Sequence, residues 1–267
     1  MLEAEAVLFE KPIAHVIEHV KPMREAGNRE TRKRYWWLHG ETVPAYRKAI
    51  QALSRYISTP RVAKHRYFVW LPTSVLPDSR LYAICRDDDL TFGILSSRQH
   101  RVWSLANASM HGVGNDPTYN AKSCFETFPF PEGMTPRDTA PKTGQASPPC
   151  MAGDILAENI AAAARRLNEL REAWLNPAEW VDWVITPEEE RVGFPKRTVA
   201  KPGHEAELKK RTLTNLYNAR PAWLDLAHKE LDKAVAAAYG WTDYTPEMAD
   251  DEILRRLLTL NLERSAI

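Results

Sequence analysis

The chain has 267 residues, 44% of them hydrophobic, which is enough for one large domain or two of ordinary size around a real core. No apolar stretch approaches the roughly 20 residues of a membrane span, and the acidic N-terminal residues do not fit the basic start of a signal peptide. We therefore expect a cytoplasmic globular protein with no membrane partner. Cys85, Cys124 and Cys150 lack the C-x-x-C spacing of a metal knuckle or redox pair, which fits a reducing compartment.

The formal net charge of +1 hides a segregation of charge along the chain. Residues 21–70 hold twelve basic and three acidic residues, a net charge of +9, whereas the 24 basic and 32 acidic residues of the remainder give −8. A segregated basic face would attract a polyanion such as a nucleic acid. The alternative interpretation is that these basic residues lie on solvent-exposed faces of helices and bind no polyanion.

The N-terminal residues 1–53 are predicted to form a helical connector. Residues 14–35 are polar and show helical spacing of their few apolar positions, and His39-Gly40 ends this segment. Pro44 can stand in the first turn of a short helix that runs to about Leu53.

Residues 54–131 are predicted to form a compact α+β unit. Three runs rich in aromatic and β-branched residues, 67–71, 81–85 and 90–95, predict strands. The polar residues 86–89 between the last two runs are short enough for a hairpin turn. Ser96 or Ser97 can then cap a helix that ends by His111-Gly112.

The remaining residues predict a linker and a helical domain. Residues 132–153 are rich in proline, glycine, serine and threonine, which is typical of an extended linker. Residues 154–267 carry four helical patterns, from Asp154 to Asn176 and over about 205–218, 221–240 and 251–262. The predicted fold class is α+β: a small mixed sheet-and-helix domain followed by an all-α helical domain.

Catalytic motifs are missing from the sequence. There is no G-x-x-x-x-G-K-[ST] phosphate loop, no H-E-x-x-H metal site and no G-x-S-x-G nucleophile turn, and the Gly112-Val113-Gly114 pair follows a predicted helix rather than a strand. Pro77-Asp78 and Glu207-Leu208-Lys209 supply the letters of a PD…ExK nuclease, but they fall in different predicted domains. We therefore expect no catalytic, cofactor-binding or metal-binding residue in this chain.

Several long strings resemble one family in the order in which they occur. They are YISTPRVAKHRYFVW at residues 56–70, PDS at 77–79, FGILSS at 92–97 with the following His100 and Trp103, GVGNDP at 112–117 and CFETFPFP at 124–131. RYWW at 34–37, LTNLYN at 213–218 with Arg220-Pro221 and Trp223-Leu224, and AYGW at 238–241 extend the similarity. Together these strings resemble the target recognition region and C-terminal helical domain of MmeI-like restriction-modification enzymes and related DNA adenine methyltransferases.

The resemblance implies a division of labour within a bacterial defence enzyme. In this family, an N-terminal Rossmann-like domain binds S-adenosylmethionine and methylates adenine N6, and the C-terminal part reads the DNA sequence. The chain resembles the C-terminal part alone, so we expect a sequence-specific recognition module for double-stranded DNA, with S-adenosylmethionine bound by a partner or by the full-length enzyme. The alternative is a protein-interaction or specificity subunit that docks a separate methyltransferase chain.

Candidate DNA-binding residues follow from the chemistry of duplex recognition, which needs cations for phosphates and bidentate side chains for base edges. Near the first strand the candidates lie on a loop, with Lys64 and Arg66 favoured for phosphates and His65 equally suited to a structural role. Arg86 lies in the predicted hairpin turn, where a solvated turn is an equal alternative. The complete predicted set is Arg61, Lys64, His65, Arg66, Arg86, Arg98, Arg101, Asn115 and Lys122.

Overall fold

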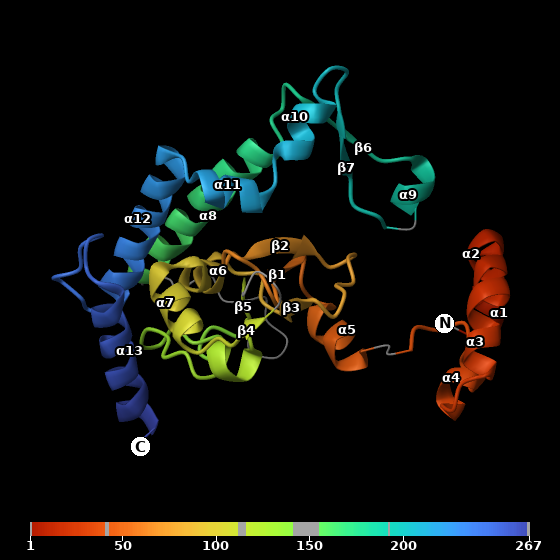
Figure 1. The fold of residues 1–267 in the computed structure, drawn as a ribbon, viewed down its shortest axis with the longest axis horizontal. Helices are drawn as coiled ribbons and strands as arrows, with labels where there is room; N and C mark the ends of the chain where they lie inside the picture. The colour runs from red at the N-terminus through yellow and green to blue at the C-terminus, as the bar shows by residue number, and fades with distance from the viewer. Residues whose placement is uncertain (1, 41–42, 112–115, 141–154, 192, 266–267) are drawn as a thin grey trace. The chain divides into compact units, whose positions relative to one another are not determined.

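A computed structural model describes residues 2–40, 43–111, 116–140, 155–191 and 193–265. It divides into two compact units, Met1–Ala49 and Ile50–Ile267 (Figure 1). No helix among the described residues is both long and apolar enough to cross a membrane.

The N-terminal unit is helical, as the sequence predicts, but its predicted long helix is divided. Pro22 cannot donate a backbone hydrogen bond, and a π-helical turn comes just before the short helix that contains it. Ala6, Ile13 and Trp36 form a small core of this unit. Its segments are α1 (Glu3–Ala6), α2 (Glu10–His15), η1 (Val16–Val20), α3 (Lys21–Glu25) and α4 (Glu30–Arg34), and α5 (Pro44–Ile50) leads into the second unit.

A three-stranded antiparallel sheet lies in the second unit, with strand order β2-β1-β3. Its strands are β1 (Arg55–Pro60), β2 (Val69–Pro72) and β3 (Leu81–Ile84), and Ile57 pairs with both Trp70 and Ile84. The sequence predicts β2 and β3, whereas β1 was missed because it carries Ser58 and Thr59. Both hydroxyls are buried and donate to backbone carbonyls of neighbouring segments.

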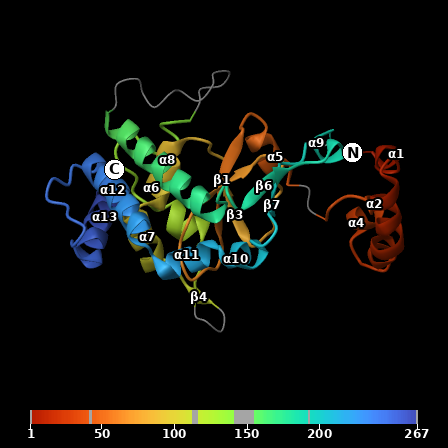
Figure 2. The same cartoon turned by 90° about the horizontal axis from the view of Figure 1, so that it is seen from above.

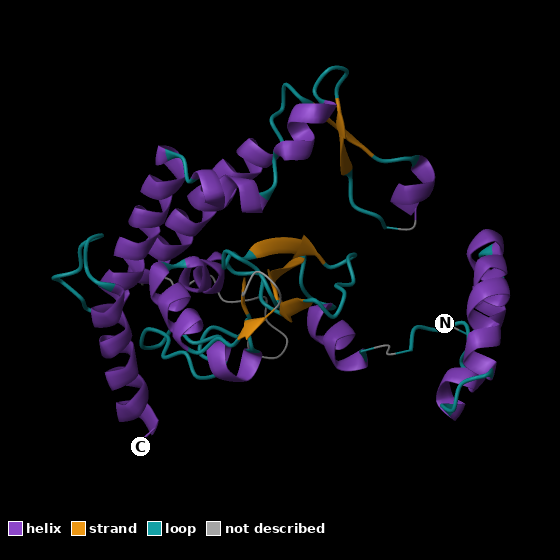
Figure 3. Cartoon of the chain, viewed as in Figure 1, coloured by secondary structure: helices purple, strands orange, loops and turns teal. Residues whose placement is uncertain are grey.

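The predicted strand at residues 90–95 is wrong, because this run lies in helix α6 (Asp89–Ser96) (Figure 3). The Asp88 carboxylate accepts a hydrogen bond from the backbone N–H of Thr91 at 2.7 Å and caps the helix, so residues 86–89 do not form a hairpin turn. Every residue from Leu90 to Leu95 is buried. An apolar run of this length has no exposed face, and its hydrophobic pattern therefore fits a buried helix as well as a buried strand.

Helix α7 (Arg98–Ala106) starts as predicted, since the Ser97 side chain accepts a hydrogen bond from the backbone N–H of His100. It is followed by β4 (Met110–His111), β5 (Asp116–Pro117) and η2 (Ala121–Phe125).

The predicted C-terminal helices are present as α8 (Ile155–Leu175), α12 (Ala222–Ala238) and α13 (Asp250–Ser265). The predicted helix over 205–218 is divided into α10 (Glu205–Lys210) and α11 (Leu213–Ala219), because Thr212 caps a new helix by accepting from Asn215 N–H. A hairpin of β6 (Val181–Val184) and β7 (Arg197–Ala200), with α9 (Pro187–Arg191) in its loop, adds strands that the sequence did not indicate.

The sheet and the C-terminal helices share one hydrophobic core. Ile57 of β1, Phe92 of α6, Ile160 of α8 and Leu231 of α12 all belong to it. Helices α8 and α12 lie side by side (Figures 1 and 2), and α6 packs closely on α8 through Gly93, where a Cβ atom would lie 2.7 Å from Ile160 Cγ2. The α+β class is confirmed, and the second unit holds residues from both domains that the sequence predicted. Residues 141–153 of the predicted linker lie outside the described residues, as does the predicted N-cap, Asp154.

Candidate nucleic-acid interface

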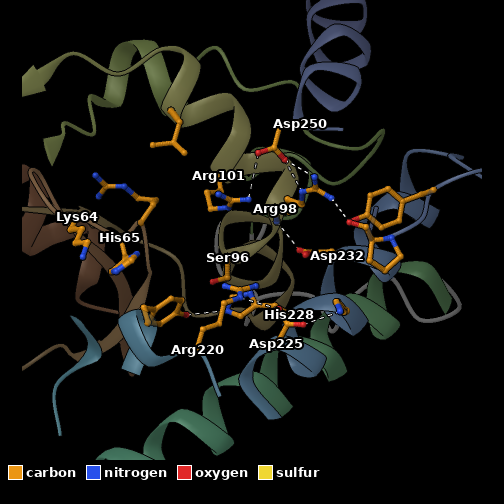
Figure 4. Close-up of a pocket in the computed structure, with 16 residues that line it drawn as sticks. Lys64, His65, Ser96, Arg98, Arg101, Arg220, Asp225, His228, Asp232 and Asp250 are labelled. Carbon is orange, nitrogen blue, oxygen red and sulfur yellow. Dashed lines mark hydrogen bonds and ion pairs between the residues drawn. The ribbon is translucent and has the colours of Figure 1, made fainter. Parts of the chain in front are cut away.

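A polar cleft of about 510 Å³ lies in the second unit. It brings together five of the residues predicted from the sequence, Lys64, His65, Arg66, Arg98 and Arg101, with side chains of the C-terminal helices (Figure 4). Its other lining residues are Ser96, Leu105, Tyr217, Arg220, Asp225, His228, Lys229, Asp232, Tyr244, Pro246 and Asp250.

One wall of the cleft is the loop between β1 and β2. Lys64 Nζ donates to Asn218 Oδ1 at 2.8 Å, and His65 Nε2 lies 2.9 Å from the same oxygen. The His65 ring also lies beside Tyr217, with ring centroids 6.0 Å apart. Asn218, at the end of α11, therefore holds two predicted contact residues while the Lys64 side chain remains exposed.

The start of α7 is fixed by two carboxylates. Asp232, which is buried, accepts from the backbone N–H of Arg98 at 2.7 Å, and Asp250 accepts from Arg98 Nε at 2.7 Å. The two Nη atoms of Arg98 donate to the carbonyls of Pro246 and Met248. Since its guanidinium is fully engaged within the protein, Arg98 orders the cleft rather than offering it a free cation.

Two other guanidinium groups of the cleft keep unused donors. Arg101 makes a 3.9 Å ion pair with Asp250 and no side-chain hydrogen bond to the described residues. Arg220 Nε donates to Asp225 Oδ1 at 2.9 Å, and its Nη groups have no hydrogen bond among the described residues. Because each guanidinium has five N–H donors, both can bind an additional anion.

The cleft has an excess of positive charge. Six cationic side chains line it against the carboxylates of Asp225, Asp232 and Asp250, an excess of three when both histidines are neutral. Burial raises the pKa of Asp232 to about 6, even though the Arg98 N–H and the nearby guanidinium groups lower it. An electropositive concave surface of this kind suits a polyanion.

A buried hydrogen-bonded chain supports the base of the cleft. Arg171 on α8 is 2% exposed, and it donates to the Phe68 carbonyl at 2.9 Å and to Tyr217 Oη at 3.3 Å. Tyr217 Oη in turn lies 3.0 Å from His228 Nε2. Burial and the neighbouring arginines lower the pKa of His228 to about 3, so its ring is neutral near pH 7 and Nε2 can accept a hydrogen bond from the Tyr217 hydroxyl. Arg171 of α8 therefore binds the residue just before β2 and Tyr217 of α11, and through Tyr217 it is connected to His228 of α12.

Arg220 has an unusual backbone conformation. It lies in the left-handed region with φ 39° and ψ 63° and caps α11 by donating its N–H to the Leu216 carbonyl. Glycine is favoured at such a cap, because the conformation costs a residue with a Cβ atom about 1–2 kcal/mol. The exposed ion pair with Asp225 contributes about 0–1 kcal/mol and does not offset that cost.

The remaining predicted residues lie elsewhere or within the protein. Arg61 lines a second hollow of about 540 Å³ and donates to the Ser79 carbonyl, and Lys122 is exposed in η2. Arg86 is 9% exposed and bonds to Asp88, Pro136 and Thr139, so it joins the α6 cap to a following loop. Asn115 lies outside the described residues.

Arg66, although it lines the cleft, is largely committed to the fold. It is 9% exposed and donates to Thr59 Oγ1, to the Pro60 carbonyl and to the Pro117 carbonyl. Burial lowers the pKa of its guanidinium.

Sequence reasoning missed Arg220 and Lys229, which line the cleft, and Asn218, which binds Lys64 and His65. Asn218 and Arg220 fall in a string that resembles the family's helical domain, but the helical pattern alone indicates only bundle packing. The Arg220-Pro221 pair was the available signal, because proline prevents continuation of the helix and leaves arginine at its end. Among the described residues no group of three or more histidine, cysteine or acidic side chains could hold a metal ion.

Comparison with known proteins identifies the first half of the chain. Residues 3–132 match the family model described as "MmeI, target recognition domain". This segment is similar to an MmeI-like target recognition domain. The resemblance seen in the sequence is thus confirmed, and the matched residues include the Lys64 to Arg101 side of the cleft.

One solved structure has the same fold as this chain over nearly the whole length of this chain. It is the type IIL restriction-modification enzyme MmeI in complex with DNA, with a TM-score of 0.58 and 16% sequence identity over 96% of this chain. DNA methyltransferase A of Bacillus subtilis (strain 168) is 28% identical over 185 residues, 68% of this chain. The chain spans 26% of the MmeI chain and 14% of the Bacillus protein.

Proposed function

We propose that the chain is a sequence-specific recognition module for double-stranded DNA that belongs to an MmeI-like DNA adenine methyltransferase or restriction-modification enzyme. The observation that carries this proposal is the electropositive cleft, where exposed cations of an MmeI-like target recognition domain meet cations of the C-terminal helices. The match to an enzyme solved with DNA supports the same partner.

The cleft residues divide into contact residues and supporting residues. Lys64 and Arg101 are exposed cations, suited to backbone phosphates, and His65 lies beside Lys64 on the same wall. Arg66 and Arg98 hold the loop and the start of α7 in place through their internal hydrogen bonds. This division gives Lys64 and Arg101 the larger effect on DNA affinity and Arg98 the larger effect on stability.

Methylation itself is assigned to a different polypeptide segment. The chain corresponds to 26% of the MmeI chain, and a methyltransferase domain that binds S-adenosylmethionine would be supplied by a longer protein or by a separate chain. A specificity subunit that docks a methyltransferase chain is the second candidate function. Co-expression with a methyltransferase chain of the MmeI-like family tests it, since a stable complex supports docking and separate elution of the two chains contradicts it.

Salt-dependent binding to a labelled duplex tests the leading function. Each phosphate contact lowers the slope of log K against log salt concentration by about 0.9. We expect binding that weakens steeply with salt, a shallower slope for Lys64→Ala and Arg101→Ala, and enrichment of one sequence from a randomised duplex pool. Absence of binding at low salt would contradict the proposal, and binding without sequence enrichment would contradict its sequence specificity.

A further inference from the structure

We infer that Arg220, at the end of α11, is a backbone-phosphate ligand that the C-terminal helices contribute to the DNA site. The inference rests on the proposed function and extends the site beyond residues 3–132, which the target recognition model covers. The ligand chemistry is a phosphodiester of the DNA backbone, held by Arg220 together with Arg101 of α7.

The first support is the backbone of Arg220. A residue with a side chain occupies a left-handed position where glycine would be favoured, and its paired carboxylate, Asp225, is partly exposed. Side chains held in such conformations concentrate at binding and catalytic sites, because the surrounding structure fixes their direction. The strained backbone of Arg220 therefore indicates a role of its guanidinium beyond packing.

The second support is the convergence of unused donors. Arg101 and Arg220 both line the cleft, Arg101 from α7 and Arg220 from the end of α11. Neither group uses its Nη donors in hydrogen bonds to the described residues. In the view of Figure 4, Ser96 lies between these two arginines, and its buried hydroxyl has no hydrogen-bond partner among the described residues.

The carboxylates of the cleft are compatible with this assignment. Asp225 lies 2.9 Å from both Arg220 Nε and Lys229 Nζ, so two cations share one carboxylate. Asp250 is likewise shared between Arg98 and Arg101. In both groups the cations outnumber the acid, and a phosphodiester would supply the missing negative charge.

Arg220→Gly separates binding from folding. Glycine accepts the left-handed backbone without strain, so this variant removes the guanidinium while favouring the native conformation. We expect a melting temperature equal to or above that of the wild-type chain. We also expect a 3- to 10-fold loss of affinity for a labelled 30-base-pair duplex at low salt, and a salt slope shallower by about 0.9. Arg220→Lys, which keeps the charge, should recover part of the affinity.

Arg166→Ala is the matched control in the full chain. Arg166 is an exposed arginine of α8 that does not line the cleft and lies 3.9 Å from Glu169, so its removal deletes one positive charge elsewhere. The inference is overturned if Arg220→Gly binds DNA with wild-type affinity and slope, or if Arg166→Ala loses as much. Either result leaves the proposed function standing, whereas failure of the wild-type chain to bind the duplex removes both.

Discussion

The Nζ atom of Lys64 lies 2.8 Å from the Oδ1 atom of Asn218, a hydrogen bond between a loop of the target recognition domain and the end of α11. The two residues are 154 positions apart in the chain. Because the same Asn218 oxygen also contacts His65, one amide group fixes two side chains at the mouth of the cleft. The cleft is thus built jointly by residues of the segment that matches the target recognition model and by the C-terminal helices.

Asn218→Ala should weaken DNA binding by about two- to twelvefold, because Lys64 and His65 lose the acceptor that orients them and the net contribution of one such bond is about 0.5–1.5 kcal/mol. Fluorescence anisotropy with a labelled duplex measures this effect. Lys64→Ala is the reference and should lose more, since it removes the charge as well. A gain of affinity in Asn218→Ala would contradict the prediction and show that Asn218 competes with DNA for the lysine.

Arg86→Ala should lower the free energy of unfolding by about 2–3 kcal/mol, because a buried guanidinium and its bonds to Asp88, Pro136 and Thr139 are lost. Urea denaturation measures this change. The salt slope of DNA binding should stay at the wild-type value, because the side chain is committed to the fold. A shallower slope with unchanged stability would instead assign Arg86 to DNA.

The secondary structure was predicted correctly where a hydrophobic pattern was compatible with only one type of element. The stripe of Leu224, Ala227, Leu231 and Val235 has a helical period, and all four residues are buried in α12. The run at residues 90–95 has no polar face, so its period could not separate a buried helix from a strand, and the interpretation as a strand was wrong.

In the candidate site, too, the sequence could not distinguish between two structural roles of the same residue type. Residue type alone made Lys64 and Arg101 candidate contacts. It made Arg86 and Arg98 candidates for the same reason, although the guanidinium groups of those two residues form hydrogen bonds within the protein. Arg220 lines the cleft, and Asn218 binds Lys64 and His65, because α11 lies beside the loop between β1 and β2. No local pattern encodes that long-range contact.

Gly93→Ala should destabilise the protein by about 1–3 kcal/mol. Helix propensity alone favours alanine by about 1 kcal/mol, but the added Cβ would lie 2.7 Å from Ile160 Cγ2 and 3.0 Å from Ala164 Cβ. Steric overlap therefore exceeds the propensity gain. Thermal unfolding measures the sign, and a stabilised variant would show that α6 and α8 can separate without loss.

This steric cause can be checked with a double-mutant cycle. Ile160→Ala removes the Cγ2 atom that meets the new side chain, so the effects of Gly93→Ala and Ile160→Ala should be less than additive. Additive effects on stability would show that Gly93→Ala destabilises the protein through a contact other than the one with Ile160.

Acid should destabilise the protein below about pH 6.5 through two buried histidines. Burial lowers the pKa of His100 to about 3, and its Nδ1 donates to the Leu95 carbonyl while Nε2 accepts from Tyr119, which fixes the neutral ring. Burial likewise lowers the pKa of His228 to about 3, so its ring is also neutral in the folded chain near pH 7. Because the unfolded chain binds these two protons near pH 6.5 and the folded chain does not, stability falls as the pH decreases from 6.5 toward 3, by about 1.4 kcal/mol per pH unit for each histidine.

Asp232 opposes this loss of stability at low pH. Replacing its carboxylate should therefore make stability fall more steeply as the pH decreases. Its pKa is raised to about 6 in the folded chain against 3.8 ordinarily, so the folded chain holds one extra proton between these values and gains stability as the pH falls. Two histidines against one aspartate leave a net slope of about 1.4 kcal/mol per pH unit between pH 4 and 6. Asp232→Asn keeps an acceptor for the Arg98 N–H, and it should bring the slope to about 2.7 kcal/mol per pH unit in urea denaturation. An unchanged slope would show that Asp232 stays ionised throughout this range.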